Sequence, residues 1–425
     1  MASFSFGAGN ARKLAGIPLY GAGRLITLLV PRSDDEWVFG CGAGIGDGAL
    51  ALWDVVAAEG HPARWLVGSD REQADAAARG IRTVPKRSLR GLWHTARARV
   101  VVVTHGFGDV NRYAVSGAFV VQLWHGIPLK RIGLDSPETL RLPALIEGLP
   151  GARSARQLLR AMYRSATRRI DIIPAASHLV RGRLESAFAL SDERVPVTGE
   201  PRVDVLSQGT PDERRSTARA QLERLAGPVD AGTRLVLYAP TWRDGAVDPA
   251  VPSTLDWRTL ESALEVNDAV MLVRSHPLGA GEYAPPSGTD RIRPLGSDLL
   301  PDVTPILPAI DALITDYSSL AFDAALVPLP VVFLAPDLEE YARRRGFYGS
   351  YADVAGDGWA LDWTGASAQL ASLLSDEGER QRRRDRSRAL SSRIHAFRDG
   401  GNTRRVYRAI LAGIEDGTRR PKGHR

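Results

Sequence analysis

Short apolar runs recur along the chain, separated by segments with the spacing of amphipathic helices. Runs of this kind, bounded by glycine, proline and polar residues, are typical of buried strands. The alternation of strands with helix-length segments predicts an α/β fold with parallel, doubly wound sheets. The predicted strands are residues 37–39, 63–67, 100–104, 118–123, 170–173 and 195–197, then 235–239, 270–274, 312–314 and 331–334. Segments of helical spacing include 49–59, 177–188 and 318–326.

The two sets of strands indicate two domains. A chain of 425 residues is longer than one hydrophobic core normally serves. A polar segment, 207–230, separates the two sets of strands. We therefore expect domains at 1–198 and 199–425. The last predicted helix, 403–415, is assigned to the second domain, although its pattern allows packing on either.

Composition narrows the functional classes only modestly. The single cysteine, Cys41, excludes an internal disulfide and fits a reducing compartment. No apolar run reaches the ~20 residues of a membrane span, and we expect no signal peptide. The formal net charge is +6, and nearly all of the positive charge is arginine. This balance favours an anionic partner such as a phosphate or a membrane surface.

Polar and reactive residues follow four of the predicted strands. The stretch "WHGIP" follows 118–123, "PTWRD" follows 235–239, "SHP" comes at the end of 270–274, and "TDYSS" follows 312–314. In doubly wound sheets, ligands bind beyond the carboxyl ends of the strands. Two sheets with such rims would enclose a polar cleft.

The most unusual of these segments is "QLWHGIPLKRIG", residues 122–133. A strand-to-helix connection needs no histidine between Trp124 and Gly126, nor Lys130 five positions later. His125 has no evident packing role, and a positioned imidazole can take a proton from a weakly acidic hydroxyl. We interpret His125 as a candidate general base.

The other strand ends suit phosphate binding, although each also has a plain structural explanation. Arg274 offers a rigid fork for phosphate oxygens, and His276 can donate to a developing charge. A helix starting at Ser318 or Ser319 would present free N–H groups, with Asp323 on the same helix face as Ser319. The alternatives are a simple turn at Arg274 and an ordinary serine N-cap.

Several common sites are absent from the sequence. "GCGAGIGDG", residues 40–48, follows a strand but lacks the G-x-G-x-x-G spacing of a dinucleotide site. It is more readily a loop that lets backbone approach a ligand or packs tightly. There is no Cys/His cluster typical of zinc and no P-loop, so the sequence requires no metal or cofactor.

Together these motifs resemble the CDP-glycerol glycerophosphotransferase family of teichoic acid synthesis. The resemblance runs from about 37 to 405 and includes "QLWHGIPLKRIG", "GEPRVD", "YAPTWRD", "RSHP", "LITDYSSLAFD" and "DLEEYARRRGFY" in family order. It implies two Rossmann-like domains facing a cleft, the GT-B arrangement. It also implies transfer of an alditol phosphate, most commonly glycerol phosphate, from a CDP-alditol to a hydroxyl, with release of CMP.

The resemblance also implies roles for individual residues. His125 would be the base and His276 a second catalytic residue, with supporting roles for Lys130, Arg243 and Asp316. Ile127 stands where many members have threonine and Val203 where many have asparagine, which bears on the identity of the acceptor. The residues implied to bind the donor are Trp124, Gly126, Ile127, Pro128, Arg202, Pro240, Thr241, Arg274, Ser275, Ser318, Ser319 and Asp323.

The acceptor implied by the resemblance is a lipid-linked saccharide or a growing polymer, which places the protein at the inner face of the plasma membrane. Residues 140–169 include a predicted helix with arginines along one face, and this pattern predicts a peripheral attachment to an anionic membrane surface. A solvated arginine face on a core-packed helix is the alternative. The arginines that share one predicted helix face are Arg153, Arg156, Arg160, Arg164 and Arg168.

Three other functions remain as alternatives. A GT-B glycosyltransferase using a nucleotide sugar would share the fold. A nucleic-acid-binding protein would fit the basic charge, but the interleaved aromatic and basic residues expected of one are not seen, so we expect no nucleic-acid partner. A binding module without activity is disfavoured by the presence of His125, Arg274 and His276.

Overall fold

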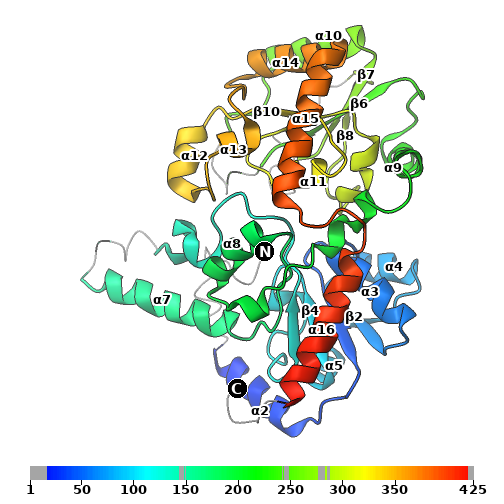
Figure 1. Ribbon diagram of the computed structural model, residues 1–425. Helices are drawn as coiled ribbons and strands as arrows, with labels where there is room; N and C mark the ends of the chain where they lie inside the picture. The colour runs from blue at the N-terminus through cyan, green and yellow to red at the C-terminus, as the bar shows by residue number, and fades with distance from the viewer. Residues whose placement is uncertain are drawn as a thin grey trace. The chain divides into compact units, whose positions relative to one another are not determined.

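Two parallel β-sheets organise the molecule (Figure 1). The computed structural model describes residues 17–142, 148, 150–241, 243, 248–275, 283–284 and 288–419. These residues divide into two compact units: unit 1 extends to Asp204 and resumes at Gly401, and unit 2 is Val205–Gly400. Each unit is a doubly wound α/β domain, which confirms the predicted fold class.

Unit 1 is built on a five-stranded sheet in the order β3-β2-β1-β4-β5, with every pairing parallel. All residues of β1, β4 and β5 are buried, as expected for strands covered on both faces. The strands are β1 Trp37–Phe39, β2 Ala63–Val67, β3 Thr83–Pro85, β4 Val100–Val103 and β5 Phe119–Gln122. The helices are α2 Ile17–Leu29, α3 Asp47–Ala58, α4 Asp70–Ala77, α5 Leu89–Arg97, α7 Ala152–Thr167, α8 His178–Phe188 and α16 Asn402–Arg419.

Unit 2 repeats this plan with the strand order β10-β9-β6-β7-β8, again entirely parallel. Counted within the unit, this is the same order as in unit 1. The strands are β6 Arg234–Ala239, β7 Ala269–Val273, β8 Ile292–Pro294, β9 Ala312–Thr315 and β10 Val331–Phe333. The helices are α9 Pro211–Ala226, α10 Thr254–Val266, α11 Leu320–Ala324, α12 Leu338–Arg345, α13 Ala352–Ala355, α14 Trp363–Ser375 and α15 Glu377–Ile394.

The strand order identifies where a ligand should bind in each unit. In a doubly wound sheet the crevice opens where the winding direction reverses, beyond the carboxyl ends of the two central strands. In unit 1 these strands are β1 and β4, and in unit 2 they are β6 and β9. The loops to inspect are therefore 40–48, 104–109, 240–243 and 316–319.

Some short elements differ from the sequence prediction. Segments 170–173 and 195–197 form only isolated bridges, Ile172 with Val121 and Val197 with Ala175. Conversely, β3 and β8 were not predicted. Both are three-residue edge strands in which only one residue is buried, so they lack the apolar run that made the equally short β1 and β10 recognisable.

The last helix, α16, belongs to unit 1 rather than to the second domain as predicted. It packs against α3 (Figure 1). Tyr407 stacks on Trp37 at 6.1 Å and meets Nε2 of His61 through its hydroxyl at 2.8 Å. Asp204 caps the start of the helix, accepting from the backbone N–H groups of Asn402 at 3.0 Å and Thr403 at 2.7 Å. The boundary near residue 199 therefore shifts to 204, and the chain returns to unit 1 at 401.

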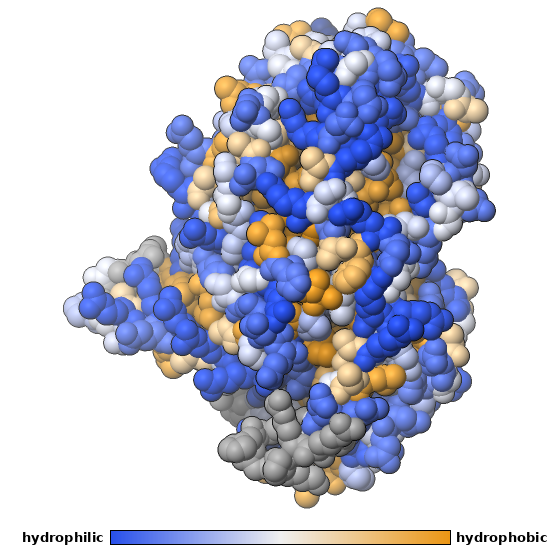
Figure 2. All heavy atoms as spheres, in the orientation of Figure 1, coloured by the Kyte–Doolittle hydropathy of each residue, from blue (hydrophilic) through white to orange (hydrophobic). Residues whose placement is uncertain are grey.

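Helix α7 extends away from the sheet of unit 1 (Figure 1). Only Tyr163 and Thr167, in its second half, are buried, and Tyr163 stacks on Phe188 of α8 at 6.4 Å. The face of α7 that is visible in Figure 2 is mainly hydrophilic. Leu158, on the first half, is 62% exposed. The arginine-bearing helix is thus anchored at one end and solvated along most of its length.

Candidate functional site

The loop after β5 presents His125 on strained backbone. Trp124 has φ 62°, in the left-handed region that bulky residues rarely adopt, and Gly126 has φ 144°. Such a conformation costs of order 1–3 kcal/mol and persists only where its surroundings impose it. The Trp124 ring packs edge-on against Phe188 at 5.1 Å and lies 4.3 Å from the ring of His125. These contacts of the Trp124 ring hold the strained conformation and thereby fix the direction in which the His125 side chain leaves the strand.

The surroundings of His125 determine its tautomer. Its Nδ1 lies 3.4 Å from the carbonyl oxygen of Thr104, which can only accept, so Nδ1 carries the proton and Nε2 keeps its lone pair. The side-chain amide of Gln122 donates to the carbonyls of Val103 at 2.8 Å and Thr104 at 3.0 Å, which holds that acceptor in place. In this tautomer the imidazole is neutral and Nε2 carries the lone pair.

Burial, together with the neighbouring His105 and Arg202, lowers the pKa of His125 to about 3. The carbonyl of Thr104 and the carboxylate of Asp109 act in the opposite direction. His125 is therefore uncharged at neutral pH in the unliganded protein, which is the state that a general base requires.

The structure adds His105, which the sequence analysis missed. Its ring stacks on that of His125 with centroids 4.1 Å apart and planes 5° from parallel. Burial lowers the pKa of His105 to about 4. A usable signal was present, because "HGFGD" directly follows the predicted strand 100–104, as the other polar segments follow theirs.

The glycine-rich loop after β1 packs against the loop after β4. A Cβ on Gly40 would lie 2.3 Å from the carbonyl oxygen of Asp109, and one on Gly42 would lie 2.5 Å from Cγ of His105. Only glycine allows this approach. At the end of the loop, a Cβ on Gly48 would lie 3.4 Å from the backbone nitrogen of Arg202. These glycines therefore shape the surroundings of His125.

The "GEPRVD" segment enters the same region of unit 1. Arg202 pairs with Glu200 at 3.3 Å, and both side chains are nearly buried. Arg202 is also close enough to His125 to lower its pKa. The predicted donor-binding residues Trp124, Gly126 and Arg202 thus lie around His125.

Other predicted residues of the 124–130 segment have packing roles. The side chain of Ile127 is fully buried. Pro128 is also buried, and its carbonyl accepts from Arg183 at 2.8 Å. Their side chains form part of the core, so only their backbone is available to a ligand. Lys130 is half-buried.

In unit 2, Arg243 and Asp316 form a buried network rather than an open ligand site. Arg243 pairs with Asp316 at 2.8 Å, with Asp337 at 2.9 Å and with Asp248 at 3.6 Å. Its guanidinium lies 5.0 Å from the ring centroid of Tyr317. Burial acts to lower the pKa of Arg243, but the three carboxylates outweigh it and raise the pKa. The network ties the loop after β6 to the loop after β9.

This network positions Thr241, whose backbone N–H donates to Asp316 at 2.9 Å. The Oγ1 atom of Thr241 is buried, with no hydrogen-bond partner among the residues that the structure describes. A buried polar atom without a partner is uncommon in proteins and invites a ligand. Pro240, the residue before it, is half-buried.

Arg274 is more constrained than the sequence suggested. Its guanidinium donates to the carbonyls of Leu300 at 2.6 Å and Pro301 at 3.0 Å. Burial lowers its pKa. These bonds anchor the side chain and occupy part of its donor fork. Ser275 is buried, and His276 lies outside the described residues.

The predicted helix at 318–326 is shorter in the structure, where α11 covers only Leu320–Ala324. Ser318 caps its start by accepting from Leu320 N–H at 3.2 Å, while the Ser319 side chain makes no capping bond. Both serines are half-buried. Asp323 is 2% exposed, so its predicted contact with the donor has little accessible surface to use.

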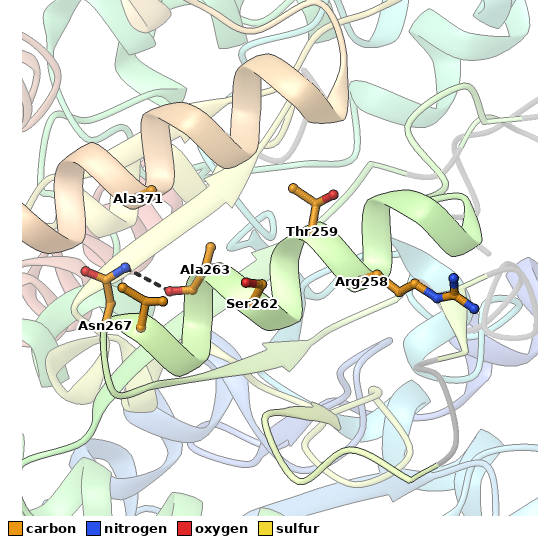
Figure 3. Close-up of a pocket in the computed structure, with 7 residues that line it drawn as sticks. Arg258, Thr259, Ser262, Ala263, Asn267 and Ala371 are labelled. Carbon is orange, nitrogen blue, oxygen red and sulfur yellow. Dashed lines mark hydrogen bonds between the residues drawn. The ribbon is translucent and has the colours of Figure 1, made fainter.

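A surface groove of unit 2 lies apart from these residues. It runs between α10 and α14 (Figure 3), and Asn267 in it donates to the carbonyl of Ala263 at 2.8 Å. Asn267 lies two residues before β7, so this part of the groove is at the amino ends of the strands, opposite the rim where ligands bind. None of the predicted site residues lines it.

Comparison with known proteins identifies relatives of this chain. Residues 35–412 match the sequence profile of CDP-Glycerol:Poly(glycerophosphate) glycerophosphotransferase. A teichoic acid glycerol-phosphate transferase of Staphylococcus aureus is 30% identical over 239 residues, covering 54% of this chain and 56% of that protein. A teichoic acid poly(glycerol phosphate) polymerase of Bacillus subtilis is 28% identical over 304 residues, covering 70% of this chain and 38% of the relative.

The chain thus spans about half or less of the length of these two relatives. A solved structure of the wall teichoic acid polymerase TagF superposes with a TM-score of 0.73 at 21% identity. The superposition covers 96% of this chain and 97% of that one. At this identity the likeness supports the fold, and it agrees with the two parallel sheets described above.

Proposed function

Because the chain belongs to the CDP-glycerol:poly(glycerophosphate) glycerophosphotransferase family, we propose that it transfers an alditol phosphate from a CDP-alditol to a hydroxyl group and releases CMP. Glycerol phosphate is the group that we favour, because the matched profile and relatives carry it in their names. The observation that carries the proposal is the neutral imidazole of His125, with Nε2 unprotonated, at a strand end beside the switch point of unit 1.

In the proposed reaction, Nε2 of His125 takes the proton of the acceptor hydroxyl as its oxygen attacks the phosphorus that bears the alditol. The bond from that phosphorus to the bridging oxygen breaks, and CMP leaves with the electron pair. A positioned base of this kind contributes ~10²–10⁴-fold. The transition state carries charge on the phosphoryl oxygens, so the donor site should consist mainly of hydrogen-bond donors and cations.

We assign donor binding to the rim of unit 2. The buried hydroxyl of Thr241 and the half-buried Ser318 and Ser319 supply groups for it. Arg274 adds a fixed positive charge, and His276 is the proposed donor to the pyrophosphate. The ion pair between Arg243 and Asp316 holds the two loops of this rim together. We assign the acceptor to unit 1, where His125 lies.

The proposed acceptor is a lipid-linked saccharide or a growing polymer of alditol phosphate. The relatives' names include both a glycerol-phosphate transferase and a poly(glycerol phosphate) polymerase. Such acceptors would be met at the cytoplasmic face of the plasma membrane.

The activity can be tested by incubating the protein with CDP-glycerol, CDP-ribitol or UDP-sugars and a lipid-linked saccharide acceptor. We expect CMP to be released from CDP-glycerol and the acceptor mass to rise by glycerol phosphate units. Release of UDP with transfer of a sugar would instead identify a glycosyltransferase. If only CDP-ribitol were consumed, the transferred group would be ribitol phosphate rather than glycerol phosphate.

A peripheral membrane attachment through residues 140–169 is also part of the proposal. No helix in the part of the chain that the structure describes is long and apolar enough to cross a bilayer. Arg156, Arg160 and Arg164 of α7 are exposed, so anionic headgroups can reach their side chains. Near a membrane each basic residue contributes ~1 kcal/mol.

Changing Arg156, Arg160 and Arg164 together to glutamate should abolish sedimentation with vesicles of phosphatidylglycerol while activity on a soluble acceptor analogue survives. The reversal of three charges replaces attraction by repulsion. A matched control changes three arginines of α15 in unit 2 to glutamate: the exposed Arg382 and Arg388 and the half-buried Arg384.

The control should sediment like the unchanged protein. Sedimentation of the α7 variant like wild type at low salt would place the attachment elsewhere. Helix α2 is then the next candidate, because it exposes several leucines to solvent: Leu19, Leu25, Leu28 and Leu29.

A further inference from the structure

Two histidines from neighbouring strand ends form a stacked pair in unit 1. His105 follows β4 and His125 follows β5, and these strands are adjacent and parallel. The rings lie 4.1 Å apart and 5° from parallel. Stacked rings at this distance share one region of low solvent access, so the charge state of one affects the other directly.

His105 is held firmly in this position. Its Nδ1 lies 2.8 Å from Oγ1 of Thr104. The carboxylate of Asp109 accepts from the backbone N–H groups of Thr104 at 3.0 Å and of His105 at 2.7 Å, which fixes the turn. On its other flank, Gly42 leaves no room for a side chain, since a Cβ there would lie 2.5 Å from Cγ of His105.

We propose that His105 is a positioning residue that keeps His125 uncharged and holds the plane of its ring for proton transfer. This inference rests on the proposed role of His125 as the base. His105 makes the stacking contact that limits rotation of the His125 ring on one face. A proton on His125 would also lie beside a second imidazole that can itself become charged.

The charged and titratable groups around the pair support this reading. Arg202, from the "GEPRVD" segment, disfavours a proton on His125, as burial and His105 do. Asp109, from the loop after β4, favours one. Lys86, which follows β3, lies close enough to Asp109 to favour the charged form of that carboxyl group. Removal of His105 removes one of the groups that keep His125 neutral and also admits water to its ring. Both changes raise the pKa of His125.

The test replaces His105 with asparagine, which retains a polar atom near Oγ1 of Thr104 but neither stacks nor ionises, and with alanine as a second variant. The acid limb of kcat/KM reports the ionisation of the free enzyme. We expect the wild-type profile to stay level from pH 8 to about pH 5.5, and both variants to lose activity across this range. A His125 pKa near 6 would remove about three quarters of kcat/KM at pH 5.5.

A matched control is His94→Asn, which removes a half-buried histidine of the same unit that pairs with Glu36 at 2.7 Å and lies outside the site. This variant should keep the wild-type profile. If His105 were only a packing residue, its variants would lower thermal stability but leave the acid limb unmoved. An unmoved limb in both folded His105 variants would overturn the proposal.

A second readout separates this inference from the proposed activity. The imidazole resonances of His125, assigned by their loss in His125→Asn, can be titrated by NMR without any substrate. We expect a His125 pKa well below the usual 6.5 in the wild type and at least one unit higher in His105→Asn. Such a result with no release of CMP would refute the activity alone. Equal His125 pKa values in both proteins would refute the role of His105 alone.

Discussion

Replacement of His125 with alanine should lower CMP release from CDP-glycerol by about 10²–10⁴-fold. The alanine leaves no group at this position to take the proton of the acceptor hydroxyl. Affinity for the CDP-alditol should change little, because the proposed donor-binding rim belongs to unit 2. Stopped-time assays of CMP release, together with calorimetric titration of the donor, measure the two effects separately.

His178→Ala is the matched control for this experiment. His178 is an exposed histidine at the start of α8 in the same unit, so its loss should leave both rate and affinity unchanged. Activity of His125→Ala within a few-fold of wild type would remove His125 from the mechanism. A large loss of donor affinity with an intact rate at saturation would instead make it a binding residue.

Replacement of Arg243 with leucine should destabilise unit 2 by about 3–5 kcal/mol, the usual effect of removing one partner from a buried ion pair. The leucine would leave Asp316, Asp337 and Asp248 without the cation that now pairs with each of them. The loops after β6 and β9 would lose their link, so donor affinity should fall as well. Urea unfolding followed by tryptophan fluorescence gives the change in unfolding free energy.

The control for this prediction is Arg382→Leu on α15. Arg382 pairs with Glu379 at 2.6 Å, but its side chain is 69% exposed, so the pair should contribute at most about 1 kcal/mol. If Arg243→Leu unfolded at the same urea concentration as Arg382→Leu, the buried network would not be what holds the rim together. Arg243→Lys should fall between the two, because lysine keeps the charge but not the planar fork.

Local sequence pattern was sufficient for much of the architecture. Eight strands were placed within one or two residues, because a buried parallel strand is a short apolar run that turn residues bound on both sides. The position of His125 at a strand end also follows from local order along the chain. The edge strands β3 and β8 were missed because only one residue of each is buried, which leaves no apolar run to recognise.

The candidate site was predicted less completely. His125, Trp124 and Arg202 were identified and do lie together, whereas Asp323 turned out to be buried. Arg243 and Asp316 were expected in supporting roles, and the structure shows them in a buried network with Asp337, which lies 94 residues along the chain from Arg243. No local pattern distinguishes an arginine that binds phosphate from one that is neutralised by distant carboxylates.

By itself, the sequence determined the fold class, the two strand sets and the strand end that carries His125, because these depend on residues near one another along the chain. Only the tertiary structure decided which strand ends are neighbours. The pairing of β4 with β5 brings His105 onto His125, and the packing of Tyr407 on Trp37 assigns α16 to unit 1. Strand order and long-range packing are set by the balance of many distant contacts, and a local apolar pattern is compatible with several such arrangements.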